Sequence, residues 1–573
     1  MHETHSAPWG ATRVGPNEWK FSIWAPTASV VCVRTGGQSF PAMRGPEGLF
    51  STIVTGREGQ TYTCVIDGTT HVDPAARWLE GGTAGPARLL GPVSRKNPAP
   101  DRDWAEVAIL EVHIGTFTHA GTFAEAASRM PGLADLGFTA IEIMPVAAFG
   151  GTRGWGYDGV FPYAVHPAYG TPQDFADLID AIHSAGMLAL LDVVYNHFGP
   201  EGCGLGMIAP PFFDKDRDTP WGPGIDFTKS HVRQFFIGNA AMWIHGFGVD
   251  GLRLDAVHQI FDPSPEHILD ELARTLRAQS PDRAIHLIAE DERNLPHDRD
   301  AGTITANWND DYHHAVHCLL TGETEGYYSG FAKDPMADLV RALAEGHVEQ
   351  GQFRNRTGAP RGAPSAHLPP TAFINANQTH DQIGNRARGE RLIALAAPEA
   401  MRVAHAMLLT APAIPMLFMG EEEGARAPFL FFADFTGDLA QAVRKGRAAE
   451  FAAFSQFGGT LPDPLSAQTF AASRPYDTPA PDADEWRALT RLCLQWRARM
   501  LVPLLGSGRV SAPDVAATGA FALRATWRFQ TGTLSMVAHL GAVPDKPSRL
   551  DAPDIVLGTV FDPFHFAVKA THQ

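Results

Sequence analysis

The residues that could do chemistry start with an arginine and an aspartate in a segment whose pattern otherwise predicts a buried strand. The stretch GLRLDAVHQI (251–260) is largely apolar, yet it carries Arg253 and Asp255. Side chains alternate along a strand, so these two share one face while Leu252 and Leu254 share the other. Charge on the inner face of a buried strand needs an explanation, because burying it is costly unless it is paired.

A second carboxyl group ends the next apolar stretch, HLIAE (286–290), at Glu290. The charge of Arg253 would hold Asp255 ionised, whereas the apolar residues before Glu290 would raise its pKa and let it carry a proton. One ionised and one protonated carboxyl group form the pair that glycoside hydrolysis needs. A buried Arg–Asp pair with a purely structural role is the alternative that this pair alone leaves open.

The elements that must position this pair are short apolar strands alternating with helical stretches. Helical periodicity occurs, for example, over 123–137, 172–186 and 230–247. Eight parallel strands with crossover helices predict an α/β fold, a (β/α)8 TIM barrel with insertions. The predicted strands are VAILEV (107–112), AIEIMP (140–145), LALLDVV (188–194), GLRLD (251–255), HLIAE (286–290), TITANW (303–308), TAFINA (371–376) and IPMLFM (414–419).

Further polar side chains follow these strands, at the carboxyl ends where barrels carry their chemistry. Carboxylates gathered on one rim repel each other, so such a set is typical of a functional site. These residues are Asp192, Asn196, His197, His258, Asp291, Asp310, Asp311, His380 and Asp381.

Strand-rich regions flank the barrel on both sides. Residues 1–100 predict a β-sandwich domain, residues 101–485 the barrel with its insertions, and residues 486–573 a C-terminal β-domain that begins with a helix.

Composition excludes several classes of protein. The formal charge is −17, from 46 basic and 63 acidic residues, which argues against nucleic-acid binding. The five cysteines lack CxxC spacing, so we expect reduced thiols and neither disulfides nor a zinc site. The first residues, MHETHSAPWG, show no secretory signal, and no apolar run is long enough to span a membrane.

Four ordered segments resemble the motifs of the α-amylase superfamily: DVVYNH (192–197), GLRLDAVH (251–258), IAED (288–291) and THDQ (379–382). The resemblance implies that Asp255 is the nucleophile that forms a glycosyl-enzyme and that Glu290 is the general acid and then the base. It also implies that Asp381 stabilises the transition state. His197 and His380 would bond to the same sugar ring, and Arg253 would orient Asp255.

Narrower features resemble the maltooligosyltrehalose trehalohydrolase family, over nearly the whole chain and including an Ig-like first domain. They are GWGYDG (154–159), YNHFGPEG (195–202), NWNDDYHHAVHCLLTGETEGYY (307–328), HDQIGNRARGERL (380–392), PMLFMGEE (415–422), PFLFF (428–432), WAPTA (24–28) and DPAARW (73–78). Members of that family are cytosolic, follow a synthase that makes the trehalose end, and cut the neighbouring α-1,4 bond to release trehalose.

The resemblance also implies the residues that bind an α-glucan oligosaccharide. Core packing is the alternative for Trp155 and Tyr157, and helix capping is the alternative for Asp310 and Asp311. The predicted binding residues are Trp155, Tyr157, Asp158, His197, Trp221, Arg253, His258, Asp310, Asp311, His313, His380, Gln382, Asn385 and Arg386.

Two positions depart from the family pattern: Thr379 stands where an asparagine is usual, and Glu423 where an aromatic residue is usual. These changes put the preference for trehalose ends in question and leave the three carboxylates untouched.

Two other functions stay open at this point. A glucan branching enzyme or another transglycosylase would share all three carboxylates, and a non-catalytic glycan-binding protein would need none of them. No acidic cluster has calcium-loop spacing, so we expect no metal and no cofactor. We expect no nucleic-acid or membrane partner, and the sequence does not say whether the synthase binds this chain physically.

Overall fold

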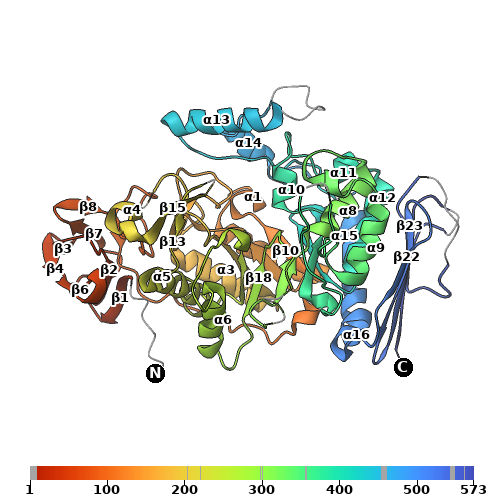
Figure 1. Ribbon diagram of the computed structural model, residues 1–573, viewed down its shortest axis with the longest axis horizontal. Coiled ribbons are helices and arrows are strands. Elements are labelled where there is room, and N and C mark those ends of the chain that lie inside the picture. Colours follow the sequence, from red (N-terminus) through yellow and green to blue (C-terminus); the bar gives the residue numbers. More distant parts are fainter. Residues whose placement is uncertain are drawn as a thin grey trace.

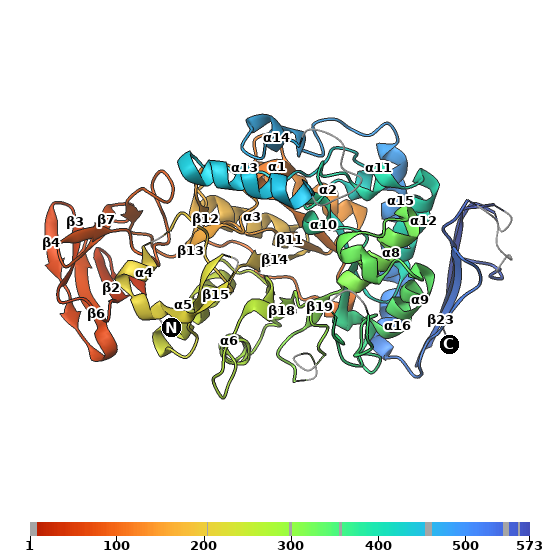
Figure 2. The same ribbon diagram turned by 45° about the horizontal axis from the view of Figure 1, so that its top comes forward.

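The computed structural model describes the chain except residues 1–8, 203, 220, 297–298, 300, 355–357, 453–460, 543–548, 560–561 and 573. Figures 1 and 2 show a row of three parts: red N-terminal sheets at one end, the barrel in the middle, and a dark-blue C-terminal sheet at the other end. Among the described residues, no helix is long and apolar enough to cross a membrane.

The N-terminal part consists of two antiparallel sheets. One has the strand order β1-β2-β6-β5, and the other has the order β4-β3-β7-β8 with β9 paired to β7. Tryptophans are buried in its core because strand alternation turns one face of each sheet inward. The strands are β1 Gly10–Gly15, β2 Glu18–Trp24, β3 Val31–Thr35, β4 Gln38–Pro41, β5 Met43–Arg44, β6 Leu49–Thr55, β7 Thr61–Ile66, β8 Thr69–His71 and β9 Ala87–Arg88.

The predicted parallel barrel is confirmed. All eight predicted strands are present and close in sequence order, each pairing in parallel with the next. They are β10 Ile109–Val112, β11 Ala140–Ile143, β14 Leu188–Val193, β17 Gly251–Leu254, β18 His286–Ala289, β19 Ala306–Trp308, β20 Phe373–Ala376 and β21 Ile414–Phe418.

Helices cover the outside of the barrel. Capping residues determine where these helices begin: Thr122 caps α2, and Thr171 forms a capping box with Asp174 at the start of α3. The main helices are α2 Phe123–Leu136, α3 Pro172–Ser184, α5 Ser230–Ala241, α6 Ile268–Ala278, α8 Asp310–Thr321, α9 Pro335–Glu345, α12 Pro398–Thr410 and α15 Ala483–Trp496.

Insertions build the rim at the carboxyl ends of the strands. Two antiparallel hairpins and a long helix, α13, are the largest of them. The added elements are α1 Ile114–Phe117, β12 Ala147–Phe149, β13 Gly159–Val165, α4 Leu205–Ile208, β15 Phe213–Thr219, β16 Gly222–Ile225, α10 His380–Gly384, α11 Leu392–Leu395, α13 Gly437–Ala452 and α14 Ala467–Ala472.

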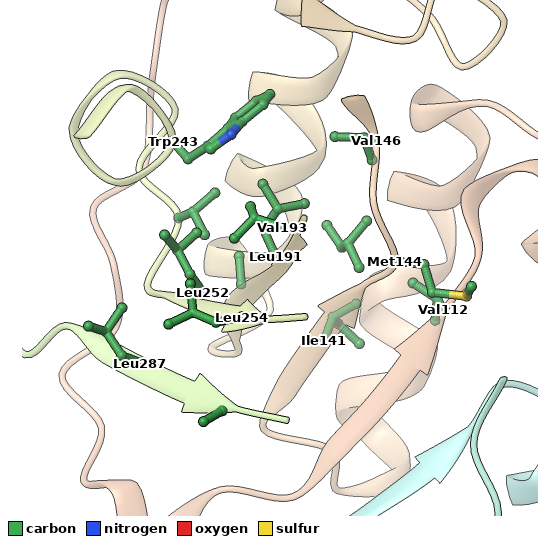
Figure 3. Packing of buried hydrophobic residues seen from close by; sticks show 14 of the residues in the cluster. Val112, Ile141, Met144, Val146, Leu191, Val193, Trp243, Leu252, Leu254 and Leu287 are labelled. Atoms are coloured by element: carbon green, nitrogen blue, oxygen red, sulfur yellow. The ribbon is translucent and has the colours of Figure 1, made fainter. Parts of the chain in front are cut away.

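Alternation along the strands separates two apolar layers. Leu252 and Leu254 lie in the outer layer with Leu191 and Val193, between strands and helices (Figure 3). A separate inner cluster fills the barrel and includes Ile288 and other inward-facing side chains. The side of β17 that carries Arg253 therefore faces the barrel axis.

The C-terminal sheet has the order β22-β23-β24-β26-β25. Its strands are β22 Asp514–Ala517, β23 Ala522–Phe529, β24 Gly532–His539, β25 Ile555–Leu557 and β26 His565–His572, after helix α16 Val502–Ser507. The predicted boundary after residue 485 falls inside α15. This helix packs on α12, where Thr490 Oγ1 lies 2.9 Å from His405 Nε2, so it belongs to the helical layer of the barrel.

Candidate active site

Arg253 lies at the centre of the rim and contacts three carboxyl groups. Its Nη1 donates to both oxygens of Asp192 at 3.0 and 2.8 Å and to Oδ1 of Asp255 at 2.8 Å. Its Nη2 donates to Oε2 of Glu290 at 2.8 Å. Strand register explains this, because Arg253 pairs with Asp192 on β14 and with Ile288 on β18, two residues before Glu290. One guanidinium therefore holds both carboxyl groups that the sequence singled out.

Asp255 is held in its ionised form. Burial alone would raise its pKa, but Arg253 and a hydrogen bond from Asn196 Nδ2 to Oδ2 (2.9 Å) hold the pKa below its usual value. The same Nδ2 donates to the backbone oxygen of Asp255 at 2.7 Å, which fixes the end of the strand. A carboxylate fixed in this way can act as a nucleophile at neutral pH.

Glu290 is held in its protonated form. Burial raises its pKa well above the usual value, and the charge on Asp255 adds to the rise although Arg253 opposes it. The backbone N–H of Ala256 donates to Glu290 Oε2 at 2.8 Å. Ala256 adopts a left-handed conformation with a φ of 41°, a strained geometry of the kind found at functional sites. The site thus holds one ionised and one protonated carboxyl group on adjacent strands.

Asp381 lies half-buried in the first turn of α10. Its Oδ1 accepts from Asn385 Nδ2 at 2.7 Å, and its backbone N–H donates to Thr379 Oγ1 at 3.2 Å. The backbone N–H of Thr379 donates to Gln382 Oε1 at 2.9 Å, which completes a capping box. Threonine therefore performs the capping role at the position where the family usually has asparagine.

Two histidines flank the carboxylates. His380 Nδ1 lies 2.5 Å from Glu111 Oε1, and although burial opposes a charged imidazole, Glu111 raises the pKa of His380. His197 Nδ1 contacts Asn196 Oδ1, and its Nε2 lies 3.1 Å from the backbone oxygen of Tyr157. Burial lowers the pKa of His197, so this imidazole is neutral.

The predicted aromatic residues differ in their exposure. Tyr157 is half-buried, donates to Asp192 Oδ2 at 2.6 Å, and stacks on His380 with ring centroids 5.0 Å apart. Trp221 is 47% exposed and stacks on His197 at 4.4 Å, so it presents a free face at the rim. Trp155 is only 8% exposed, and its indole N–H donates to the backbone oxygen of Leu430 at 3.0 Å. For Trp155 the geometry favours the core-packing alternative.

Two predicted binding residues are buried and bonded to other protein groups. Asp311 is buried and accepts from the backbone N–H groups of Val348 and Glu349 at 2.7 and 2.8 Å. Its other oxygen accepts from Arg361 at 3.0 Å. His313 is buried between the backbone oxygen of Asn377 and the hydroxyl of Tyr328, at 2.6 and 3.1 Å. These contacts favour a structural role for both side chains over sugar binding, because protein groups already occupy their polar atoms.

The remaining predicted residues lie nearer the rim. Asp310 is half-buried and accepts from Gln382 Nε2 at 3.2 Å, while burial and Asp381 raise its pKa to about 6. Burial likewise raises the pKa of Asp158 to about 6. His258 Nε2 lies 3.6 Å from a carboxylate oxygen of Glu292.

Arg386 and Glu423 each form an ion pair with another side chain of the protein. Arg386 is half-buried and forms two bonds of 2.8 Å to Glu323. Glu423 pairs with Arg487 on α15 and so turns towards the helical layer.

Sequence reasoning did not assign roles to Asp192 and Glu111, which are buried on the barrel interior. Glu111 is the single charged residue in its strand VAILEV, the same signal that revealed Arg253. Among the residues that the structure describes, no group of three or more histidines, cysteines, aspartates and glutamates could hold a metal ion.

Comparisons with known proteins agree with this geometry. The family model of the alpha amylase catalytic domain matches residues 99–203. A Malto-oligosyltrehalose trehalohydrolase of Deinococcus radiodurans is 41% identical over 464 residues, which cover 79% of this chain and 76% of the relative. A protein of the same name from Rhizobium sp. (strain M-11) is 36% identical over 94% of this chain and 93% of the relative.

A solved structure matches the whole architecture. A crystal structure of a Salmonella typhimurium protein aligns with a TM-score of 0.93 and 42% identity over 99% of both chains. Known pullulanase structures, at 15–18% identity, share the fold alone. From its catalytic-domain match, its barrel and its close relatives, the chain belongs to the malto-oligosyltrehalose trehalohydrolase family of alpha-amylase-type glycoside hydrolases.

Proposed function

We propose that this protein is a retaining glycosidase that cleaves the α-1,4 bond next to the terminal trehalose of a maltooligosyltrehalose and releases trehalose. The observation that carries the proposal is the shared guanidinium of Arg253, which contacts ionised Asp255 and protonated Glu290 at 2.8 Å each. Retaining enzymes hold their two carboxyl groups close together, at about 5–5.5 Å, and one guanidinium that holds both is suited to that spacing.

The first step forms a covalent intermediate. A carboxylate oxygen of Asp255 bonds to the anomeric carbon, while the bond from that carbon to the leaving oxygen breaks and Glu290 gives its proton to that oxygen. Negative charge thereby moves from Asp255 to Glu290. Because Arg253 contacts both groups, its positive charge stabilises either distribution.

The second step restores the enzyme. Ionised Glu290 takes a proton from water, the resulting hydroxide attacks the anomeric carbon, and the bond to Asp255 breaks. Asp381, fixed by Asn385, is placed to bond to hydroxyl groups of the sugar ring. The exposed face of Trp221 offers a surface on which a sugar can stack.

The proposed cellular setting follows from the substrate. We place the reaction in the cytosol, downstream of a synthase that creates the trehalose end of an α-glucan oligosaccharide. The names of the relatives support this substrate class.

Product analysis tests the proposal. The protein is incubated with maltotriosyltrehalose and, separately, with maltopentaose, and the products are separated by chromatography. We expect rapid release of trehalose from the first and slow attack on the second, with the α-anomer of maltotriose formed first. Longer or α-1,6-linked products would instead establish a transglycosylase. Full activity in Asp255→Asn would refute catalysis at this site.

A further inference from the structure

Glu142 is a buried glutamate inside the barrel, next to the residues of the proposed catalytic centre. Neither step of the proposed mechanism involves it. It lies on β11 and is 1% exposed. Its neighbour Ile141 belongs to the outer apolar layer (Figure 3), so strand alternation turns Glu142 into the barrel. Neither of its carboxyl oxygens accepts a hydrogen bond of good geometry among the described residues, although the side chain of Trp308 lies close enough to act as a weak donor.

Among the described residues no cation forms an ion pair with Glu142, because the neighbouring cations are paired with other carboxyl groups. On β10, Glu111 is its register partner and is paired with His380. On β14, Asp192 is paired with Arg253 and also accepts from Tyr157. The guanidinium of Arg253 is already shared with Asp255 and Glu290.

An ionised Glu142 would therefore be a buried charge without compensation, which is among the most costly arrangements in a protein interior. The charged groups acting on it are Glu111, Asp192 and Arg253, and Trp308 faces it from β19. Burial, followed by Glu111 and Asp192, raises the pKa of Glu142 well above its usual value, although Arg253 and Trp308 oppose the rise.

We propose that Glu142 is a positioning residue of the catalytic centre, which stays protonated inside the barrel and so leaves the charge of Arg253 to Asp192, Asp255 and Glu290. The carboxyl group contributes because it is neutral and does not compete for Arg253. Its ionisation at alkaline pH would attract Arg253 away from the two reacting carboxyl groups above it. The catalytic part of this inference rests on the proposed hydrolase function.

Glu142→Gln tests the inference because glutamine has nearly the same shape and cannot ionise. We measure kcat/KM for maltotriosyltrehalose from pH 5 to pH 10. We expect wild type and variant to agree within about threefold up to neutral pH. At alkaline pH the wild type should lose activity first, because only it gains the charge at residue 142.

Three outcomes would overturn the proposal. Coincident alkaline limbs would show that the charge at Glu142 does not matter. An alkaline limb that moves to lower pH in the variant would show that Glu142 is already ionised and supports the proton on Glu290. A uniform loss at every pH would show a purely structural role.

A stability measurement separates this inference from the proposed function. Above a pH of about 4.5 the unfolded chain ionises at residue 142 while the native state keeps the proton, so native stability falls with rising pH until the native pKa is reached. With rising pH, the free energy of unfolding of wild type should therefore fall relative to that of the variant. The difference in slope should correspond to one proton more bound in the native state than in the unfolded state. The exposed Glu399, changed to glutamine, is the matched control and should show no difference in slope. Equal slopes for wild type and Glu142→Gln would overturn the proposal even if no substrate were cleaved.

Discussion

Replacing Arg253 by lysine tests the core of the site, because it keeps the positive charge and removes the planar fork of donors. In the structure the two Nη atoms bind Asp255, Glu290 and Asp192 at 2.8–3.0 Å. A single ammonium on a flexible chain cannot satisfy all three in this geometry. We therefore assume that the Arg253→Lys variant loses two of these hydrogen bonds.

The expected magnitude follows from those two bonds. A hydrogen bond to a charged group contributes about 1.5–3 kcal/mol, so the loss is about 3–6 kcal/mol. At about 1.4 kcal/mol per factor of ten, kcat/KM should fall by about 10²–10⁴. The pKa of Asp255 should also rise, because Arg253 is the main group that lowers it. Asp255 must be ionised to attack, so the acidic limb of the pH profile should move to higher pH.

The assay is kcat/KM for maltotriosyltrehalose as a function of pH, with thermal melting to establish that the variant is folded. Arg293→Lys is the control, because Arg293 is 43% exposed and forms an ion pair with Asp291, which is not one of the proposed catalytic carboxyl groups. That variant should stay within about fivefold of wild type. A folded Arg253→Lys enzyme with more than a third of wild-type activity and an unmoved acidic limb would refute the role assigned to Arg253.

Three further variants test neighbouring contacts. Glu111→Gln should lower the pKa of His380, which NMR can measure, because Glu111 raises that pKa. It should also reduce kcat/KM by about 10- to 100-fold, because a hydrogen bond to a charged group is lost. An unchanged pKa of His380 would contradict the pairing. Asp311→Ala should destabilise the fold by about 2–5 kcal/mol in urea unfolding, because two buried backbone N–H groups, of Val348 and Glu349, would lose their acceptor. A loss of less than about 1 kcal/mol would contradict a structural role. Trp221→Ala should raise KM for maltotriosyltrehalose more than it lowers kcat, and a change confined to kcat would exclude a sugar-stacking role.

Much of the scaffold could be predicted because its signals are local. Strands such as LALLDVV and helices such as α3 are encoded by apolar periodicity and capping residues within a few positions of one another. The closed barrel followed from the alternation of such elements. The predicted boundary after residue 485 falls inside α15, because no local sequence signal indicates that α15 packs on α12.

The contacts of the site residues could be predicted less well from the sequence. Asp310 and Asp311 are adjacent in sequence, but successive residues on a helix point about 100° apart, since a turn takes about 3.6 residues. One therefore lies half-buried near Asp381, and the other is buried against the loop at Val348. Trp155 likewise lies in the motif of a binding site yet packs in the core.

The sequence by itself determined the barrel, the order of its motifs, and which aspartate and glutamate stand at the ends of neighbouring strands. Only the tertiary structure decided that Arg253 contacts both, that Glu111 pairs with His380 across 269 positions, and that no cation in the described part of the chain forms an ion pair with Glu142. The physical reason is that charge pairing depends on distances across the closed barrel, whereas strand and helix patterns depend on neighbours along the chain.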